Sequence, residues 1–526
     1  MNIEQLYKIF LRHPQVTTDS RHCPEGSIFF ALKGDTFNGN RFAAAALQNG
    51  CSYAVIDEPI AIESSPSKIE GVPDRAGAYE KCAGAYDKSR FILVDDVLST
   101  LQQLAHMHRQ HFRGPVIQIT GTNGKTTTKE LVSTVLAQKY NVLYTQGNLN
   151  NHIGVPMTLL RLTDDHDIAV IETGANHPGE IKALANIVDP DFGLITNVGV
   201  AHIEGFGSFE GVVKTKGELY DYLRNKKEKV SSEEASAAIF LNGDNPHLSK
   251  IAEGLAAFTY GRPGHHYDIE GEVLECAPFL KLRWNISSPS KIEGVPDRAG
   301  AYENGHSAIL NNITTHLIGA YNIDNVLAAV SVGMYFGVEP NQICAAIEGY
   351  VPSNNRSEMR RTPKNVLIVD AYNANPSSMK AALDNFALIT PPEGMTKMLI
   401  LGEMRELGTV SEQEHTNVIE HIKSMVNGQC STPKGSRAAR RLSAKPVPTL
   451  KSRENEVSMF NDQCSMFNEN SVWLVGENFQ RLNPPFRTFT NVDEVKAQLK
   501  AAPIDSHLIL IKGSNGTHLY ELPEYL

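Results

Sequence analysis

A glycine-rich stretch in the first third of the chain combines the residue types that bind phosphate groups. In order, its residues are Gly121, Thr122, Asn123, Gly124, Lys125, Thr126 and Thr127. An apolar run precedes it, and a helical pattern over 129–138 follows it. In such a strand–turn–helix, backbone N–H groups and the positive end of the helix dipole face an anion. Lys125 adds a cation for the outer phosphates, and the Thr126 hydroxyl can bind Mg²⁺.

This stretch is shorter than the eight-residue phosphate-binding loop, because Ile119 stands where the first glycine is expected. A match of this length arises by chance fairly often, so its surroundings decide its meaning. Apolar runs at 116–119, 168–171 and 194–198 alternate with helical patterns, which predicts a parallel sheet covered on both faces. Polar residues follow each run directly. Because ligands of such sheets bind at the carboxyl ends of the strands, the context favours a genuine phosphate site.

Two of these strand ends carry candidate metal ligands. Glu172 ends the second run, where a carboxylate can hold Mg²⁺ for phosphoryl transfer. Capping of a helix or a turn is the alternative for Glu172. His202 lies in the loop after the third run, and there a metal role and a structural or surface role both stay open.

Lys216 is predicted to face the protein interior. Within a helix over 209–223, apolar residues lie three and four positions from Lys216 on both sides, whereas Lys214 points away. Burial lowers the pKa of an amine. A neutral amine can react with CO₂ to give a carbamate, which is an anionic metal ligand. The residues alone favour the alternative, a lysine with a buried stem and an ammonium group that reaches water.

Two polar segments further along the chain are candidates for ligand binding. Asn322 and Asn325 lie three positions apart on one helix face, where their amides could read a purine edge or cap the helix. The second segment follows Asp370 and consists of Tyr372, Asn373, Ala374, Asn375 and Pro376. It is rich in hydrogen-bonding groups for a simple turn, so we expect it to contact a ligand.

Composition describes an ordinary multidomain protein. The chain has 526 residues, of which 41% are hydrophobic and 21% charged, and a net charge of −10 argues against nucleic-acid binding. No apolar run approaches the roughly 18 residues of a membrane span. The N-terminus lacks the apolar region of a signal peptide. Seven cysteines without a Cys-x-x-Cys pair fit reduced thiols, so we expect a cytoplasmic protein.

The patterns predict an α/β protein of three domains. They are a small N-terminal domain over 1–112, a central parallel-sheet domain with the phosphate loop over 113–352, and a C-terminal Rossmann-like domain over 353–526. Gly114 and Pro115 mark the first linker. Segment 64–80 and its identical copy 287–303 are expected to be inserted, exposed and flexible loops without catalytic duty. Segment 427–470 is expected to be a flexible insertion, with a docking segment as the alternative.

Taken together, these residues resemble the ATP-dependent Mur ligases of peptidoglycan synthesis. The matching stretches cover nearly the whole chain outside the insertions and are 17–21, 29–34, 121–127, 146–156, 172–176, 201–207, 215–218, 322–325, 356–358, 372–376 and 512–514. The turn at 372–376 is the most specific to the branch of the family that adds D-alanyl-D-alanine. Two positions depart from the family: Asn355 replaces a glycine before Arg356, and Asn515 replaces an arginine after 512–514.

The resemblance implies UDP-binding, ATPase and amino-substrate domains in chain order. The γ-phosphoryl of ATP would pass to the terminal carboxylate of a UDP-N-acetylmuramoyl tripeptide, and the amine of D-alanyl-D-alanine would then displace phosphate. The implied catalytic residues are Lys125, Lys216 and His202. The implied Mg²⁺ ligands are Thr126, Glu172, His202 and a carbamylated Lys216. The implied ATP contacts are the phosphate loop with Asn322, Asn325, Arg356 and Asp370. The implied substrate contacts are Ser20, Arg21, Asn150, Asn151, Tyr372, Asn373 and Asn375.

Two other functions are open to the sequence. One is a different amide-forming ligase on the same scaffold, either like folylpolyglutamate synthase or an amino-acid-adding Mur ligase. The other is a binding protein that uses ATP only for domain closure. The 372–376 turn argues against the first, and the complete set of candidate metal ligands argues against the second. We expect a monomer that binds small molecules and no nucleic acid.

Overall fold

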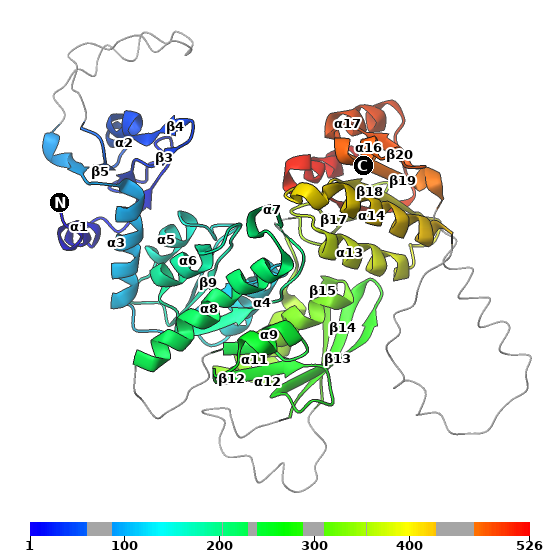
Figure 1. The fold of residues 1–526 in the computed structure, drawn as a ribbon, viewed down its shortest axis with the longest axis horizontal. Helices are drawn as coiled ribbons and strands as arrows, with labels where there is room; N and C mark the ends of the chain where they lie inside the picture. Colours follow the sequence, from blue (N-terminus) through cyan, green and yellow to red (C-terminus); the bar gives the residue numbers. More distant parts are fainter. Residues whose placement is uncertain (60–86, 202, 230–238, 288–309, 354, 428–467) are drawn as a thin grey trace, which may run out of the picture. The chain divides into compact units, whose positions relative to one another are not determined.

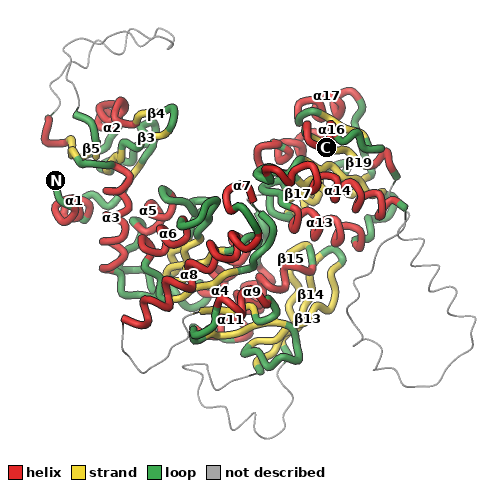
Figure 2. Tube along the Cα trace, viewed as in Figure 1, coloured by secondary structure: helices red, strands yellow, loops and turns green. Residues whose placement is uncertain are grey.

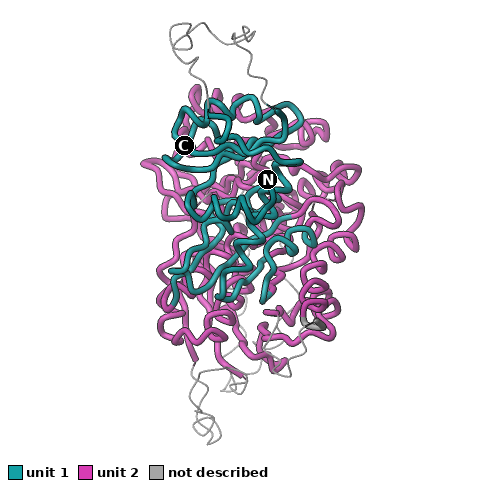
Figure 3. Tube along the Cα trace, turned by 90° about the vertical axis from the view of Figure 1, so that its left-hand side faces the viewer, with its two compact units in different colours: residues 1–119, 140–174, 181–192 teal, residues 120–139, 175–180, 193–526 magenta. Residues whose placement is uncertain are grey.

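The computed structural model describes residues 1–59, 87–201, 203–229, 239–287, 310–353, 355–427 and 468–526. The predicted insertion 64–80 lies outside these ranges, and so do 287–303 and 427–470 apart from residues at their ends; their flexibility stays a prediction. The chain forms two compact units (Figure 3). Unit 1 contains 1–119, 140–174 and 181–192, and unit 2 contains 120–139, 175–180 and 193–526. Both have a mixed α/β fold with parallel strands (Figures 1 and 2).

Unit 1 begins with a small parallel sheet. Its strands, in spatial order, are β1 (Val16–Thr17), β2 (Ile28–Phe30), β5 (Tyr53–Ile56) and β6 (Phe91–Leu93). Side chains of a strand alternate between the two faces. Ile28 and Phe30 therefore join a core with helices α1 (Ile3–Phe10) and α3 (Val97–His111). Phe29 faces the other way and packs with helix α2 (Ala43–Gln48).

Unit 1 also contains three parallel strands from beyond the predicted first boundary. In spatial order they are β7 (Val116–Thr120), β9 (Ile168–Glu172) and β8 (Val142–Tyr144). Helices α5 (Gly154–Leu159) and α6 (Glu180–Val188) contribute side chains to the same core. This apolar core includes Leu104 before the predicted boundary and Val116 and Leu143 after it. The predicted linker therefore joins two segments that share one core.

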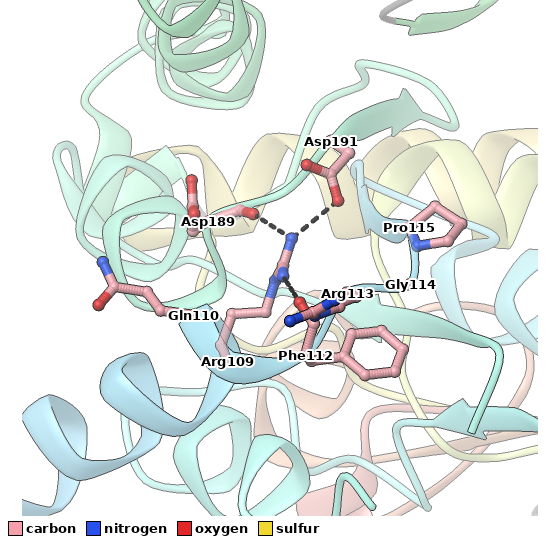
Figure 4. A pocket seen from close by; sticks show the side chains of 8 residues that line it. All are labelled: Arg109, Gln110, Phe112, Arg113, Gly114, Pro115, Asp189 and Asp191. Carbon is pink, nitrogen blue, oxygen red and sulfur yellow. Dashed lines mark hydrogen bonds and ion pairs between the residues drawn. The ribbon is translucent and has the colours of Figure 1, made fainter. Parts of the chain in front are cut away.

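Arg109, near the end of α3, fixes the segment that was predicted as a linker (Figure 4). Its guanidinium donates to the carbonyl oxygens of Phe112 at 3.1 Å and Asp189 at 3.0 Å and to Asp191 Oδ2 at 2.7 Å. The same carboxylate oxygen accepts a hydrogen bond from Val116 N at 2.9 Å. The start of β7 and the end of α3 thus share one carboxylate, which sets the direction of the strand that leads to the phosphate loop.

The central part of unit 2 contains six paired strands. In spatial order its strands are β10 (Phe192–Ile195), β11 (Ile239–Asn242), β12 (Ala257–Gly261), β13 (Ile269–Cys276), β14 (Phe279–Ile286) and β15 (Asn311–Ile318). Pairing is parallel from β10 to β13 and antiparallel from there to β15. Because β10 ends at Ile195, the polar loop after it begins earlier than the predicted strand over 194–198 implied.

Three helices of this part carry or support candidate site residues. They are α4 (Lys125–Leu136), α8 (Phe209–Lys229) and α11 (Ile323–Tyr335). Helix α4 begins four residues before the predicted helix 129–138. The run of β-branched threonines at 126–128 disguised its first turn, since such residues have low helix propensity. A Cβ on Gly333 of α11 would lie 2.4 Å from the Val135 side chain of α4, so the two helices pack closely.

The C-terminal part of unit 2 is a second sheet. In spatial order its strands are β16 (Glu358–Arg361), β17 (Val366–Asp370), β21 (His507–Lys512), β18 (Thr396–Gly402), β19 (Val472–Val475) and β20 (Arg487–Phe489). Only β16 is antiparallel to its neighbour. Helices α13 (Pro376–Leu388) and α14 (Ser411–Val426) pack on one face, and α17 (Val492–Ala501) packs on the other. Helices on both faces of a mostly parallel sheet fit the predicted Rossmann-like domain.

Among the described residues, no helix combines the length and the apolar character that a membrane crossing requires.

Candidate active site

The phosphate loop leaves β7 in a conformation that requires glycine at two positions. Gly121 has φ 145°, and a Cβ there would lie 2.0 Å from Thr196 Oγ1. Gly124 has φ 77°, and a Cβ there would lie 2.5 Å from Asn325 Oδ1. Both glycines thus stand where a side chain would be strained and would collide with a neighbour. The Gly-x-x-Gly spacing is therefore a geometric requirement of this loop.

Helix α4 starts directly at this loop without a side-chain cap. Gly124 is its N-cap residue and makes no side-chain hydrogen bond to the first turn. The helix dipole and the N–H groups of that turn are therefore directed at the loop, which is the arrangement that binds anions. Lys125 Nζ lies back over the loop and donates to the carbonyl oxygens of Gly121 at 2.9 Å and Thr122 at 3.0 Å. These neutral partners can be exchanged for phosphate oxygens, which would bind the ammonium more strongly.

The residues after β10 hold the loop in place. Thr196 Oγ1 and Asn197 Nδ2 donate to the carbonyl of Asn123 at 2.6 Å and 3.0 Å, and Asn197 Oδ1 accepts from Asn123 N at 2.9 Å. Thr122 N donates to the Asn197 carbonyl at 3.0 Å. Thr196 and Asn197 were not among the predicted site residues. Their place at the end of an apolar run was the one signal that pointed to them.

Glu172 ends β9 with its side chain fully buried. Its Oε1 accepts a hydrogen bond from Asn150 Nδ2 at 2.8 Å, which links two of the predicted site residues. Asn151 Oδ1 instead accepts from Ile153 N at 3.1 Å and Gly154 N at 2.8 Å, at the start of α5. The structure thus gives Asn151 a capping contact, and its predicted substrate contact stays a prediction.

The oxygen donors of the predicted metal site fit Mg²⁺, which prefers hydroxyl, carboxylate and water oxygens. Thr126 is 3% exposed and Glu172 is fully buried. Within the described ranges no group of three or more His, Cys, Asp and Glu side chains is arranged to hold a metal ion. His202 lies outside those ranges, so its metal role stays a prediction.

Lys216 lies on the buried face of α8, as helix periodicity predicted. Lys216 is 2% exposed, while Lys214 points outward. Lys216 Nζ donates to the Ala175 carbonyl at 3.4 Å and lies 5.3 Å from the centre of the Phe206 ring. Burial, with repulsion from Lys125 as a smaller cause, lowers the pKa of Lys216 to about 7. Part of the Lys216 population is therefore a neutral amine near neutral pH, the form that reacts with CO₂.

The turn after β17 is organised by an ion pair. Lys512, at the end of β21, lies directly opposite Asp370 in the sheet, and its Nζ donates to Asp370 Oδ2 at 2.5 Å. The second Asp370 oxygen accepts from Ser357 N at 3.2 Å. The Arg356 guanidinium lies 3.7 Å from the centre of the Tyr372 ring. Three residues predicted to contact ligands are therefore neighbours at one edge of this sheet.

Asn375 connects this turn to the phosphate loop within unit 2. Its Oδ1 accepts from Ser378 N at 2.9 Å and caps α13, while its Nδ2 donates to Asn123 Oδ1 at 2.7 Å. Asn375 is 5% exposed, so this amide contact is protected from water. Asn373 Oδ1 accepts from Ala374 N at 2.8 Å within the turn itself. The structure thus brings Asn123 and Asn375 together and leaves Asn373 with a local contact.

The two residues that depart from the Mur ligase pattern, Asn355 and Asn515, both lie among the described residues. Asn355 has φ 58°, a left-handed conformation that glycine and asparagine tolerate best, which explains how asparagine replaces glycine before Arg356. Asn515 begins a short 3₁₀ helix after β21.

In unit 1, Arg21 forms two hydrogen bonds of 2.9 Å to the Asp19 carboxylate, and they lower the pKa of Asp19 to about 2. Ser20 contributes its carbonyl, which accepts from Asn49 Nδ2 at 2.8 Å.

Asn322 and Asn325 point into the protein. Asn322 Nδ2 donates to the Ile318 carbonyl at 2.9 Å, and Asn322 Oδ1 accepts from Asn325 Nδ2 at 2.8 Å. Asn325 Oδ1 accepts from Thr128 Oγ1 at 3.0 Å. Neither residue caps its helix through its side chain. A contact of either amide with adenine would replace one of these bonds, and that contact stays a prediction.

This combination of a parallel sheet, a glycine-lined loop and an uncapped helix start defines a nucleotide-binding α/β protein. Three family models match the chain: the Mur ligase family catalytic domain at residues 14–109, the Mur ligase middle domain at 119–333, and the Mur ligase glutamate ligase domain at 355–515. The chain belongs to the Mur ligase family.

Individual relatives are similar over most of their length. The UDP-N-acetylmuramoyl-tripeptide–D-alanyl-D-alanine ligase of Bacillus subtilis is 33% identical over 427 residues, which are 79% of this chain and 80% of the relative. The crystal structure of MurF from Acinetobacter baumannii has a TM-score of 0.70 at 25% identity and covers 97% of this chain and 92% of that one. MurF ligase from Thermotoga maritima, solved in complex with ADP, has a TM-score of 0.68 at 20% identity, with coverage of 97% and 96%.

Proposed function

We propose that this protein is an ATP-dependent ligase that joins D-alanyl-D-alanine to a UDP-N-acetylmuramoyl tripeptide in peptidoglycan precursor synthesis. In the first step, a carboxylate oxygen of the tripeptide attacks the γ-phosphorus of ATP, and ADP leaves. In the second step, the dipeptide amine attacks the acyl carbon, phosphate leaves and the nitrogen loses a proton. The product is one new amide bond for each ATP consumed.

The observation that carries this proposal is the hydrogen bond between Asn123 and Asn375. Asn123 belongs to the loop that would bind the phosphates of ATP. Asn375 belongs to the turn that resembles the D-alanyl-D-alanine-adding branch of the family. If these two assignments are right, the bond would bring an activating site and an amine site within reach of a shared acyl phosphate, which a ligation reaction requires. The names of the related proteins support the same substrates.

The residues of the chain divide the work of phosphoryl transfer. Lys125 and the start of α4 would bind the phosphate oxygens and stabilise the charge that develops on them. Thr126 and Glu172 would hold Mg²⁺, with His202 and a carbamylated Lys216 completing the site. Mg²⁺ would supply charge neutralisation between the phosphate groups. The ADP complex of a related MurF ligase supports binding of an adenine nucleotide by this protein.

The remaining assignments complete the proposal. Residues 1–112 would bind the UDP group, with Ser20 and Arg21 among the contacts; residues 113–352 would bind ATP; and residues 353–526 would bind the dipeptide. The protein would act as a monomer. The four described cysteines are free, which supports a reducing cytoplasm.

Joint substrate dependence tests the proposed reaction. We expect phosphate release from ATP only when UDP-N-acetylmuramoyl tripeptide and D-alanyl-D-alanine are both present, with a product whose mass equals the sum of the two minus water. Phosphate release with neither substrate, or with a folate in place of the tripeptide, would show another function.

Lys125→Ala tests whether the loop performs the chemistry. We expect a loss of phosphate release of at least about 100-fold, because a charge-stabilising donor of the transition state is removed. Lys380→Ala is the matched control, since Lys380 is an exposed lysine paired with Asp384 on the surface of α13. Equal rates for the two variants would exclude the loop from catalysis.

A further inference from the structure

Buried polar side chains connect helix α11 to the phosphate loop and to helix α4. Thr128 is fully buried, Asn322 is 4% exposed and Asn325 is 7% exposed. Thr128 lies one turn into α4, and its N–H donates to the Gly124 carbonyl at 2.8 Å. The other two belong to the segment that starts α11. A continuous hydrogen-bonded network therefore links the second glycine of the loop to the end of β15.

The direction of every hydrogen bond in this network follows from one carbonyl group. The Ile318 carbonyl can only accept, so the amide nitrogen of Asn322 must face it at 2.9 Å. Asn322 then presents its oxygen to Asn325 Nδ2 at 2.8 Å, which turns the oxygen of Asn325 toward Thr128. The Thr128 hydroxyl must donate to that oxygen, at 3.0 Å. The network therefore has only one arrangement of donors and acceptors.

The same amide oxygen also lies against the loop. Asn325 Oδ1 occupies the space where a Cβ of residue 124 would be, 2.5 Å away. Gly124 has φ 77°, one of several conformations that glycine adopts freely, so neighbouring groups are needed to select it. The bond from Thr128 fixes Asn325, and Asn325 fills the space beside Gly124. The loop is thereby held in its binding shape before a nucleotide arrives.

We propose that Thr128 is a positioning residue for nucleotide binding, which acts by holding Asn325, backed by Asn322, against Gly124. This inference rests on the proposed function, since it assigns the loop to the phosphates of a nucleotide. A loop that is already ordered loses less entropy when it binds. The network therefore contributes to affinity for nucleotide phosphates without touching them.

Thr128→Val tests this role, because valine keeps the shape of threonine and removes the hydroxyl. We expect the affinity for ADP, measured by calorimetry, to fall roughly tenfold, since a buried amide oxygen loses its donor. The KM for ATP should rise in proportion, while the KM for the UDP-linked tripeptide stays unchanged. Thr128→Ser keeps the hydroxyl and should restore the affinity for ADP. Thr134→Val, on the same helix and away from the loop, should bind ADP as the wild type does.

Asn325→Asp tests the same network at its next member, although Asn325 is itself a predicted ATP contact, so Thr128→Val decides between positioning and direct contact. An aspartate keeps the acceptor for Thr128 and replaces the amide donor with an oxygen that faces Asn322 Oδ1, so we expect a loss of ADP affinity at least as large. Thermal unfolding of each variant without nucleotide separates folding from positioning. A variant that is less stable but binds ADP normally when folded would overturn the proposal, as would normal affinity in Thr128→Val.

Binding of ADP also separates this proposal from the proposed function. If the wild type binds ADP but releases no phosphate with the two muramoyl-ligase substrates, the reaction is wrong and the network is still judged by ADP affinity. If the wild type fails to bind ADP, both proposals are wrong.

Discussion

Lys216 and Lys512 are both almost fully buried, but their amino groups have different partners. Lys512, at the end of β21, lies 2.5 Å from a carboxylate oxygen of Asp370. Lys216, on α8, instead donates to the Ala175 carbonyl and lies over the Phe206 ring. A carboxylate partner holds a buried ammonium in its charged form, whereas burial without such a contact favours the neutral amine. The partner, and not the depth of burial, distinguishes the two lysines.

Lys216→Met should produce the largest effect on stability, namely on how the free energy of unfolding varies with pH. The pKa of Lys216 in the folded protein is about 7, while an unfolded lysine has a pKa of about 10.4. Above pH 7 the unfolded chain therefore binds more protons than the folded one, and the free energy of unfolding of the wild type rises with pH. We expect a rise of about 1.4 kcal/mol per pH unit relative to Lys216→Met, up to a total of a few kcal/mol.

Urea denaturation at pH 6.5, 8 and 9.5 measures this difference. Lys214→Met, on the exposed side of the same helix, should keep the pH dependence of the wild type. The ligase activity of Lys216→Met should be lost even though its stability is equal or higher, because the reactive amine is gone. If the stabilities of Lys216→Met and the wild type vary equally with pH, Lys216 stays protonated and the contrast with Lys512 fails.

Asp370→Asn should give the next largest effect, because it turns Lys512 into a buried cation without its carboxylate. We expect a loss of about 3 kcal/mol in the free energy of unfolding. The double variant with Lys512→Met should recover much of this loss. Glu420→Gln, which breaks the exposed pair with Lys423 at 2.8 Å, should cost less than about 0.5 kcal/mol. A small cost for Asp370→Asn would mean that Lys512 is held by other groups.

The hydrogen bonds of Asn375 involve no charged group, in contrast to the buried lysines. We therefore expect substitutions of Asn375 to change stability least. Asn375→Ala removes the cap of α13 and should cost about 1 kcal/mol in thermal unfolding. Asn375→Asp keeps a capping oxygen but loses the amide donor to Asn123. It should therefore fold nearly as well as the wild type and show a raised KM for D-alanyl-D-alanine. An unchanged KM would separate the turn from the dipeptide site.

Features that depend on one periodic segment could be predicted from the sequence. The helix that carries Lys216 begins at the predicted position, Phe209, and the inward direction of Lys216 followed from the helical period. The strand end that carries Glu172 was also located correctly. In each case the signal lies in residues that are close in sequence, where one face of a helix or strand must be apolar.

Features that depend on distant segments could not be predicted. Thr196 and Asn197 hold the phosphate loop only because β10 ends beside it, and the sequence does not encode that register locally. The direction of the Asn325 amide depends on a carbonyl at the end of β15 and a hydroxyl on α4. The start of α4 was missed because its first turn is stabilised by its surroundings more than by helix propensity.

The hydrogen bond between Asn123 and Asn375 has a thermodynamic consequence. If occupation of the phosphate loop strengthens this bond, it must also favour the conformation of the turn that contains Asn375. Coupling between two sites is reciprocal, so the factor by which nucleotide raises the affinity for dipeptide equals the factor by which dipeptide raises the affinity for nucleotide. One amide pair, 2.7 Å apart, would then make each ligand an effector of the other.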